Sequence, residues 1–550
     1  MAEIDVIVDS KSEHGVRDPH ASSASPNTEL VVDVCSACAY GDLEKLRGFV
    51  ERDGQSVSTP DRNGYYAIQW AALNNFPNVV LYVIEHGGDV NASDHRKQTA
   101  LHWAAVNGSI PVADVLLQNG ARVEAVDISG YRAVHVAAQY GQTSFLNRII
   151  AKYGADHDAT DNDGRSPLHW AAYKGYTDVI RLLLFRNAYQ GKQDGNGCTP
   201  LHWAALSGNL EGCTVLVHAG NKRELVVKDR NGFTPANLAA NRGYRHVAYI
   251  LSNAGKTRGN FCKGRMFSGT TGTVGYAPIL LFLIIILVIL FINSIMLGPG
   301  FPEATTVVLL SGWIGVSLAL SSLIMFYRCS SKDPGYIKPN SGKSETRESD
   351  PLLDIDFNNS TWTGSWSQLC PTCKIIRPVR SKHCPQCKHC VEQFDHHCPW
   401  ISNCVGKNNR WDFFVFVFMG ALTSSIGAAV AMHRLWTWSP QIPSSETWMH
   451  LVMLEHPGAV SFMVMDVILL SGTLTLTVTQ AYQVARNITT NELANSARYS
   501  YLRGADGHFR NPYNHGCHKN CSDFLIRGYI DDEIAWPSLQ QAVPHKHTKI

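Results

Sequence analysis

The sequence RSPLHWAA at residues 165–172 recurs as CTPLHWAA at residues 198–205, and as the near-copy QTALHWAA at residues 98–105. The period is about 33 residues, and it continues on both sides of these lines. A fixed period of this length indicates a stack of similar units, none of which can bury its apolar face alone. The blocks begin at Asp61, Asp94, Asp127, Asp161, Asp194 and Asp229.

Each block predicts two short helices. Thr199 or Ser166 followed by Pro favours a helix start, because the hydroxyl caps exposed amides and proline fits the first turn. The alanine pair lets neighbouring helices approach closely. Gly175 and Gly208 follow these helices, where a glycine ends a helix at little cost. The units therefore predict a helical solenoid.

These lines resemble ankyrin repeats, about seven of them, over residues 29–255. Residues 1–28 are polar and read as a disordered cytosolic tail. The resemblance implies a concave groove that binds protein segments. Four tryptophans recur in register, and they serve either packing between repeats or ligand recognition. They are Trp70, Trp103, Trp170 and Trp203.

The C-terminal half contains four apolar blocks, each long enough to cross a bilayer core of about 30 Å at 1.5 Å per residue. We expect membrane helices at residues 277–297, 306–327, 413–435 and 459–484, with a linker at 256–276. The two short loops after the first and third blocks lack Lys and Arg, whereas the opposite flanks are basic. This bias predicts that the array, the loop at 328–411 and the C-terminal region at 485–550 are cytosolic.

Seven of the 15 cysteines lie between Cys370 and Cys404, which indicates metal binding rather than disulfides. Two tetrahedral zinc sites need eight Cys or His donors. Six cysteines and two histidines supply them, and one cysteine is then spare. Cys398 lies beside histidines and an aspartate, as a candidate nucleophile should. Residue types alone also allow a purely structural zinc module with Cys398 as a ligand.

Several motifs accompany this cluster. They are DHHC at 395–398, DPG at 333–335, Asn403, Asn408 and Phe414 downstream, TTNE at 489–492, and NPYNHGCHKN at 511–520. Together they resemble the DHHC palmitoyltransferases, in the branch that carries ankyrin repeats. The resemblance implies that a palmitoyl group moves from palmitoyl-coenzyme A, through Cys398, onto cysteines of other proteins.

The resemblance also implies residue roles within a zinc module at about 368–411. One structural zinc would be held by Cys370, Cys373, His383 and Cys390, and the other by Cys384, Cys387, His397 and Cys404. Cys398 would be the nucleophile, His396 the general base and Asp395 the residue that orients it. Thr490 and Asn520 would support the site, whereas His389 has no assigned role.

The expected fold is therefore mostly α: an ankyrin solenoid, then a four-helix transmembrane domain with a cytosolic zinc module. The expected partners are the bilayer, acyl-coenzyme A and protein substrates recruited by the array. A basic surface with Arg377, Arg380 and Lys382 either meets coenzyme A phosphates or is solvated charge. The resemblance places the chain in the endomembrane system, at the Golgi.

Other classes of protein agree less well with the sequence than this enzyme does. A net charge of +2 gives no reason to expect a nucleic-acid partner. A channel would need a pore segment that the sequence does not offer. A membrane-anchored ankyrin scaffold with an inactive zinc module is the main alternative, although an intact DHHC motif disfavours it. Four cysteines near the bilayer are interpreted mainly as structural, with self-acylation as the alternative: Cys262, Cys329, Cys517 and Cys521.

Overall fold

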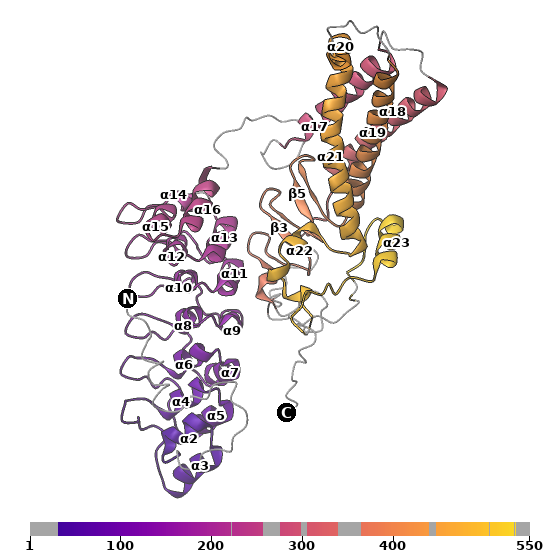
Figure 1. Cartoon of the computed structure of the whole chain (residues 1–550). Helices are drawn as coiled ribbons and strands as arrows, with labels where there is room; N and C mark the ends of the chain where they lie inside the picture. The colour runs from indigo at the N-terminus through magenta and orange to yellow at the C-terminus, as the bar shows by residue number, and fades with distance from the viewer. Residues whose placement is uncertain are drawn as a thin grey trace. The chain divides into compact units, whose positions relative to one another are not determined.

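A computed structural model (Figure 1) describes residues 31–221, 223–256, 275–298, 305–338, 352, 365–438, 447–504, 506–532 and 534. The chain divides into two compact units. One comprises residues 1–260 and 342–376, and the other comprises residues 261–341 and 377–550. The described residues are mostly helical, which confirms the predicted fold class.

In the described residues of the first unit, seven pairs of short helices follow one another along the chain. They confirm the predicted ankyrin solenoid. A short π-helical turn, η1 (Gly48–Arg52), follows the first pair, and a short helix, α14 (Arg223–Val226), precedes the last. The pairs are α2 (Val34–Tyr40) with α3 (Leu43–Arg47), α4 (Ala67–Leu73) with α5 (Pro77–Glu85), α6 (Ala100–Asn107) with α7 (Ile110–Gln118), α8 (Ala133–Gln139) with α9 (Thr143–Tyr153), α10 (Pro167–Lys174) with α11 (Thr177–Phe185), α12 (Pro200–Leu206) with α13 (Leu210–Ala219), and α15 (Pro235–Asn241) with α16 (Arg245–Lys256).

The block-starting aspartates hold the turns between repeats. Oδ1 of Asp94 accepts hydrogen bonds from the backbone N–H groups of Arg96 and Gln98, both at 2.9 Å. The other five aspartates accept from the residues two and four positions on in the same way. Such turns satisfy backbone N–H donors locally. Each repeat therefore needs an aspartate at this turn, and the aspartates mark the period in the sequence.

Buried histidines link four of the repeats to the repeat that follows. The backbone N–H of Ser166 donates to Nδ1 of His169 at 3.0 Å, so the ring proton resides on Nε2, which lies 3.2 Å from the carbonyl oxygen of Cys198 in the following repeat. His102, His135 and His202 make the same pair of bonds. Burial lowers the pKa of His169 to about 4, so this imidazole is neutral at pH 7.

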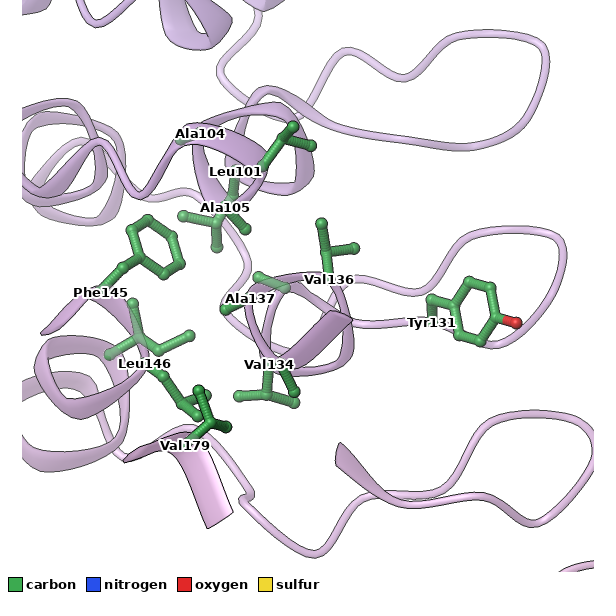
Figure 2. Packing of buried hydrophobic residues seen from close by; sticks show 14 of the residues in the cluster. Leu101, Ala104, Ala105, Tyr131, Val134, Val136, Ala137, Phe145, Leu146 and Val179 are labelled. Carbon is green, nitrogen blue, oxygen red and sulfur yellow. The ribbon is translucent and has the colours of Figure 1, made fainter. Parts of the chain in front are cut away.

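The core of the array is built from small and branched side chains. Figure 2 shows Ala105 of α6 facing the side of α8 that carries Val136 and Ala137, with Phe145 of α9 beside them and Val134 on the opposite side of α8. All four repeat tryptophans are buried. The indole N–H groups of Trp70, Trp170 and Trp203 donate to Oδ2 of the aspartate that starts their own repeat. These contacts favour the packing interpretation of the tryptophans.

The second unit contains four helices long and apolar enough to cross a membrane. They are α17 (Ala277–Leu290) continued by the π-helical η2 (Phe291–Met296), α18 (Thr306–Ser331), α19 (Arg410–Thr437) and α21 (Pro457–Ala485). A further helix, α20 (Trp448–Glu455), precedes α21 and was not predicted from the sequence. Several helices continue past the apolar blocks, because a helix need not end where the hydrocarbon does.

Three two-stranded antiparallel hairpins carry the cysteine cluster. Their strands are β1 (Leu369–Cys370) with β2 (Ile375–Ile376), β3 (Lys382–Cys384) with β4 (His389–Val391), and β5 (His396–Cys398) with β6 (Asn403–Val405). A 3₁₀ turn, η3 (Trp366–Gln368), precedes β1. After α21 come α22 (Thr490–Ala494), the 3₁₀ turns η4 (Ser496–Arg498) and η5 (Ser500–Leu502), and α23 (Cys517–Arg527).

Candidate active site

The hairpins gather Cys and His side chains into two groups of four. In each group the candidate ligand atoms lie within 4.8 Å of one another. The first group is Cys370, Cys373, His383 and Cys390, and the second is Cys384, Cys387, His397 and Cys404. These are the sets that the sequence motifs implied.

The local chain conformation suits zinc. In each Cys-x-x-Cys turn the backbone N–H of the second cysteine donates to Sγ of the first at 3.4 Å. The lysine after each turn, Lys374 or Lys388, has positive φ, which curls the backbone around the sulfurs. Four Cys or His donors per group form a closed tetrahedral set that fits structural Zn²⁺. Bound there, zinc would supply folding free energy and hold the hairpins together.

Cys398 belongs to neither group. Alternate residues of a strand point to opposite faces, so His396 and Cys398 share one face of β5 and His397 points to the other. His397 accordingly joins the second metal group, while His396 hydrogen-bonds the Cys398 thiol. Strand alternation thus separates a structural histidine from a histidine beside the free cysteine.

Asp395 is fully buried and is held from several sides. Its Oδ2 accepts from Nδ1 of His396 at 2.7 Å and from the Thr490 hydroxyl at 2.8 Å. Its Oδ1 accepts from the Thr490 backbone N–H at 2.8 Å and lies 3.8 Å from the Arg410 guanidinium. These partners, from α19 and the start of α22, restrain the carboxylate beside Nδ1 of His396.

The electrostatics of this triad follow from these contacts. Burial opposes charge on all three groups, but hydrogen bonds and opposite charges outweigh it. The bond from His396 and the charge of Arg410 hold the pKa of Asp395 well below its usual value. Asp395 and Cys398 raise the pKa of His396 to about 9. The bond to His396 in turn lowers the pKa of Cys398, which favours a thiolate–imidazolium pair.

Apolar side chains from three membrane helices surround Cys398. Its cluster includes Leu280 of α17, Phe326 of α18, and Phe413 and Val417 of α19. The turn after Cys398 is tied to the start of α17, because the Tyr276 N–H donates to the Pro399 carbonyl at 2.9 Å. The thiol therefore sits in apolar surroundings at the ends of the membrane helices.

Asn403 connects this hairpin to the end of α18. Its Nδ2 donates to the carbonyl oxygens of Cys329 at 3.1 Å and Lys332 at 2.9 Å. Asn409 adds a bond to the Cys329 carbonyl at 3.3 Å. The side chain of Asn409, rather than that of the motif residue Asn408, therefore also links this part of the chain to the end of α18.

The structure corrects one expectation about the basic surface. Arg380 is buried, and its guanidinium is bidentate to Glu492 at 2.8 and 3.0 Å. It also donates to Asn487 and Asp532. With its donors engaged inside the protein, Arg380 is not available for coenzyme A phosphates. The nearby Lys382 ammonium donates to Asn491 at 2.7 Å.

The structure also shows the surroundings of Asn520 and His389, two further residues singled out in the sequence. Asn520 is fully buried, and its Nδ2 donates to the Ala485 carbonyl at 2.9 Å, which links α23 to the end of α21. His389, which had no assigned role, is exposed, and its Nδ1 lies 2.7 Å from the Cys387 carbonyl. Neither side chain belongs to a metal group among the residues that the structure describes.

Three polar residues near the site were missed by the sequence reasoning. Arg410 begins α19, and Gln480 and Gln483 lie in the last turns of α21. Nε2 of Gln480 lies 3.5 Å from Oδ2 of Asp395, and Oε1 of Gln483 accepts from the Thr490 hydroxyl at 3.2 Å. Two glutamines inside an otherwise apolar block were a usable signal, because buried polar groups in membrane helices need partners.

Comparisons with known proteins agree with this site. The family model described as DHHC palmitoyltransferase matches residues 365–497, and the model for ankyrin repeats matches residues 34–127, 134–224 and 187–262. The "Probable protein S-acyltransferase 23" of Arabidopsis thaliana is 56% identical over 95% of this chain and 97% of its own length. "Palmitoyltransferase ZDHHC17" is 30% identical in Danio rerio, over 90% of this chain and 87% of that protein. The Homo sapiens protein of that name is 29% identical, over 93% and 88%.

The fold and the site together define a multi-pass membrane acyltransferase with an ankyrin array and two Cys/His clusters that could hold zinc. The chain belongs to the DHHC palmitoyltransferase family, and it is a protein S-palmitoyltransferase.

Proposed function

We propose that Cys398 carries the palmitoyl group as a thioester, that palmitoyl-coenzyme A is the donor, and that Asp395 and His396 activate the thiol. The observation that supports this assignment is the hydrogen-bonded series from Asp395 through His396 to Cys398, beside two donor sets that are complete without Cys398. The eight donors of those sets hold two structural zinc ions in this proposal.

The chemistry proceeds in two steps. The Cys398 thiolate attacks the carbonyl carbon of the acyl-coenzyme A thioester, the bond to the coenzyme A sulfur breaks, and the His396 imidazolium gives its proton to that sulfur. Neutral His396 then takes the proton of a substrate cysteine, whose sulfur attacks the acyl-enzyme and releases Cys398. Two-step transfer of this kind gives ping-pong kinetics.

The apolar cluster around Cys398 supports the choice of a fatty acyl donor. Transfer of an acyl chain out of water is favourable by about 0.8 kcal/mol per CH₂ group. Side chains of α17, α18 and α19 meet at the thiol, so the chain of the donor lies among the membrane helices while its thioester reaches Cys398.

We further propose the location and recruitment that the sequence suggested. The array at residues 29–255, the zinc module at 368–411 and the tail at 485–550 face the cytosol, consistent with the basic flanks Arg328, Lys332 and Arg486. The compartment is the Golgi. The ankyrin array recruits protein substrates through its groove.

The decisive experiment is incubation of the purified full-length protein with labelled palmitoyl-coenzyme A. We expect hydroxylamine-sensitive label on the wild-type chain and none on Cys398→Ser. Cys213→Ser, which changes a buried cysteine of the array, is the matched control and should label normally. Label that survives Cys398→Ser would exclude Cys398 as the acyl carrier and would favour the scaffold alternative for this module.

A further inference from the structure

The short helix α23 presents Cys517 and two large apolar side chains away from the protein, whereas Cys521 is half-buried against the cluster of Phe524. Its buried face carries Asn520 and Phe524. On the other side, Cys517 is exposed, and Leu525 and Ile526 are 60% and 81% exposed. Cys517, Cys521 and Leu525 are spaced by four residues, so they form one stripe along the helix. Sγ of Cys517 lies 3.9 Å from Sγ of Cys521.

Two neighbouring residues of α19 fix the level of this helix. The Phe413 ring lies 5.4 Å from the His396 ring and belongs to the apolar cluster of Cys398. The Phe414 ring lies 5.8 Å from the Phe524 ring of α23. Consecutive residues of a helix differ by about 1.5 Å along its axis and about 100° around it. Helix α23 therefore packs against α19 at the level where the Cys398 cluster does, but on another side of that helix.

Exposed Leu525 and Ile526 beside the end of a membrane helix are explained by lipid. An amphipathic helix with such residues on its outer face lies in the interface of the bilayer. The other cysteines outside the metal groups differ from Cys517. Within the described part of the chain, Cys35, Cys38, Cys213 and Cys329 are buried or half-buried in helices, Cys198 is half-buried in the loop before α12, and Cys517 is the cysteine with an exposed side chain.

We propose that Cys517 is an S-acylation site of this enzyme, with Cys521 as a secondary acceptor, and that Cys398 of a second copy of the chain is the acyl donor. The inference rests on the proposed role of Cys398. The Cys517 sulfur attacks the carbonyl carbon of the acyl-Cys398 thioester. A new thioester forms at Cys517, the bond to Cys398 breaks, and the Cys517 proton passes through His396 of the donor copy to its released Cys398.

The geometry selects a second copy as the donor. Within one chain the two thiols lie on different sides of α19, since Phe413 belongs to the cluster of Cys398 and Phe414 contacts Phe524 of α23. In two copies in one membrane, Cys398 and α23 meet α19 at neighbouring residues, so lateral diffusion can bring the donor thiol of one copy to the acceptor helix of the other. The acyl chain on Cys517 would enter the bilayer next to Leu525.

The test mixes two purified full-length chains in lipid vesicles with labelled palmitoyl-coenzyme A. One is wild type, and the other is a size-tagged Cys398→Ser chain that acts only as acceptor. We expect hydroxylamine-sensitive label on the tagged chain only when wild type is present. Adding Cys517→Ser to the tagged chain should reduce this label at least threefold, and Cys517→Ser with Cys521→Ser should abolish it. Adding Cys213→Ser instead, as the matched control, should leave it unchanged.

A second variant tests the role of the membrane contact. Leu525→Ser with Ile526→Ser in the tagged chain keeps both thiols and the buried Phe524, and we expect it to lower the label several-fold. Equal label in that variant would contradict a lipid-facing acceptor helix.

Each remaining outcome is informative. An unlabelled tagged chain beside a wild-type chain that carries label at Cys398 would overturn this inference and leave the proposed function intact. Label on the tagged chain without wild type would overturn it too, because the acyl group would then come directly from coenzyme A. A wild-type chain without label would contradict the proposed function, and this inference with it.

Discussion

Buried histidines of the ankyrin array and the buried histidine beside Cys398 meet different partners. In the array, Nδ1 of His169 accepts a backbone N–H and Nε2 faces a carbonyl oxygen, so the ring is neutral and its pKa is lowered to about 4. In the zinc module, Nδ1 of His396 donates to the Asp395 carboxylate, and the pKa of the ring is raised to about 9.

The cysteines repeat this contrast. Burial raises the pKa of Cys213 in the array to about 12. Cys398 is also buried, yet hydrogen bonding to His396 lowers its pKa. The comparison teaches that burial alone favours the neutral form of these side chains, and that a carboxylate hydrogen-bonded to the histidine reverses the direction of both pKa shifts.

The largest expected effect comes from removing zinc. It should change the zinc module and leave the ankyrin array unaffected. Structural zinc contributes on the order of 10 kcal/mol or more to the folding of such a module. We expect Cys384→Ser to lower zinc content from two ions to one per chain, to abolish acyl transfer, and to increase hydrogen exchange in β3–β6 but not in the array. The control is His389→Gln, which changes a histidine outside both groups. A zinc content unchanged by Cys384→Ser would contradict the ligand assignment.

The next largest effect is expected at Asp395, whose carboxylate accepts a hydrogen bond from His396 and has no counterpart at the array histidine His169. Asp395→Asn removes the charge that stabilises the His396 imidazolium, and we expect acyl-enzyme formation to slow by about 10²–10⁴-fold. Because the pKa of His396 falls, the alkaline limit of the rate should move from about pH 9 to lower pH. Rates measured between pH 6 and 10 check both effects.

A graded pair of variants accompanies that measurement. Thr490→Val removes the hydroxyl that donates to Asp395 and should slow the reaction less than Asp395→Asn does. Thr490→Ser keeps the hydroxyl and should restore most of the rate. If Asp395→Asn reacted as fast as wild type at every pH, the proposed role of the triad would be wrong.

A smaller effect is expected for the buried ion pair behind the triad. Replacing Arg380 by Gln leaves the Glu492 carboxylate without its bidentate partner, which typically costs about 3–5 kcal/mol. We expect faster hydrogen exchange in α22 and lower activity without a specific rise in KM for acyl-coenzyme A. Arg377→Gln, at a half-buried neighbouring arginine, is the control. A pure KM effect of Arg380→Gln would reinstate the coenzyme A interpretation.

The smallest effect lies in the array. The pKa of His169 is about 4 when folded and about 6.5 when unfolded, so the unfolded chain binds more protons between these values. The stability that neutral His169 contributes is therefore complete above about pH 6.5 and is lost as the pH falls towards 4. The expected loss is about 2 kcal/mol at pH 5 for this histidine. Hydrogen exchange of α10 and α12 at pH 5 and 7 measures it.

The chain supplies its own control for this prediction. Gln69 occupies the position of His169 in an earlier repeat, where its Oε1 accepts from the Tyr66 N–H at 2.8 Å and its Nε2 donates to the Gln98 carbonyl at 2.7 Å. His169→Gln should keep both bonds but cannot titrate, so the acid sensitivity at α10 should decrease. Unchanged sensitivity would mean that His169 is not the titrating group.

Local sequence patterns and the motif resemblance were sufficient to predict much of the structure. The repeat period predicted the array because each aspartate turn and each interrepeat bond is made within about one period, as from His169 to Cys198. The resemblance also named the two groups of four donors that the hairpins gather. Whether those donors hold zinc, and whether Cys398 carries the acyl group, remain predictions.

What the sequence did not reveal depends on distant contacts. Arg380 was read as a surface charge, because no local pattern places it beside Glu492, 112 residues later in the chain. Arg410 and Gln480 lie at the ends of membrane helices, where polar residues are ordinarily expected at the interface. Only the fold shows that they converge on Asp395.

The link between Asn403 and α18 has a mechanical consequence. Asn403 is the register partner of Cys398 across the β5–β6 hairpin, and its side chain holds the last carbonyls of α18. A tilt of α18, such as a thinner or thicker bilayer imposes, therefore carries the hairpin with it. The height of the Cys398 thiol relative to the hydrocarbon is therefore coupled to the tilt of a membrane helix.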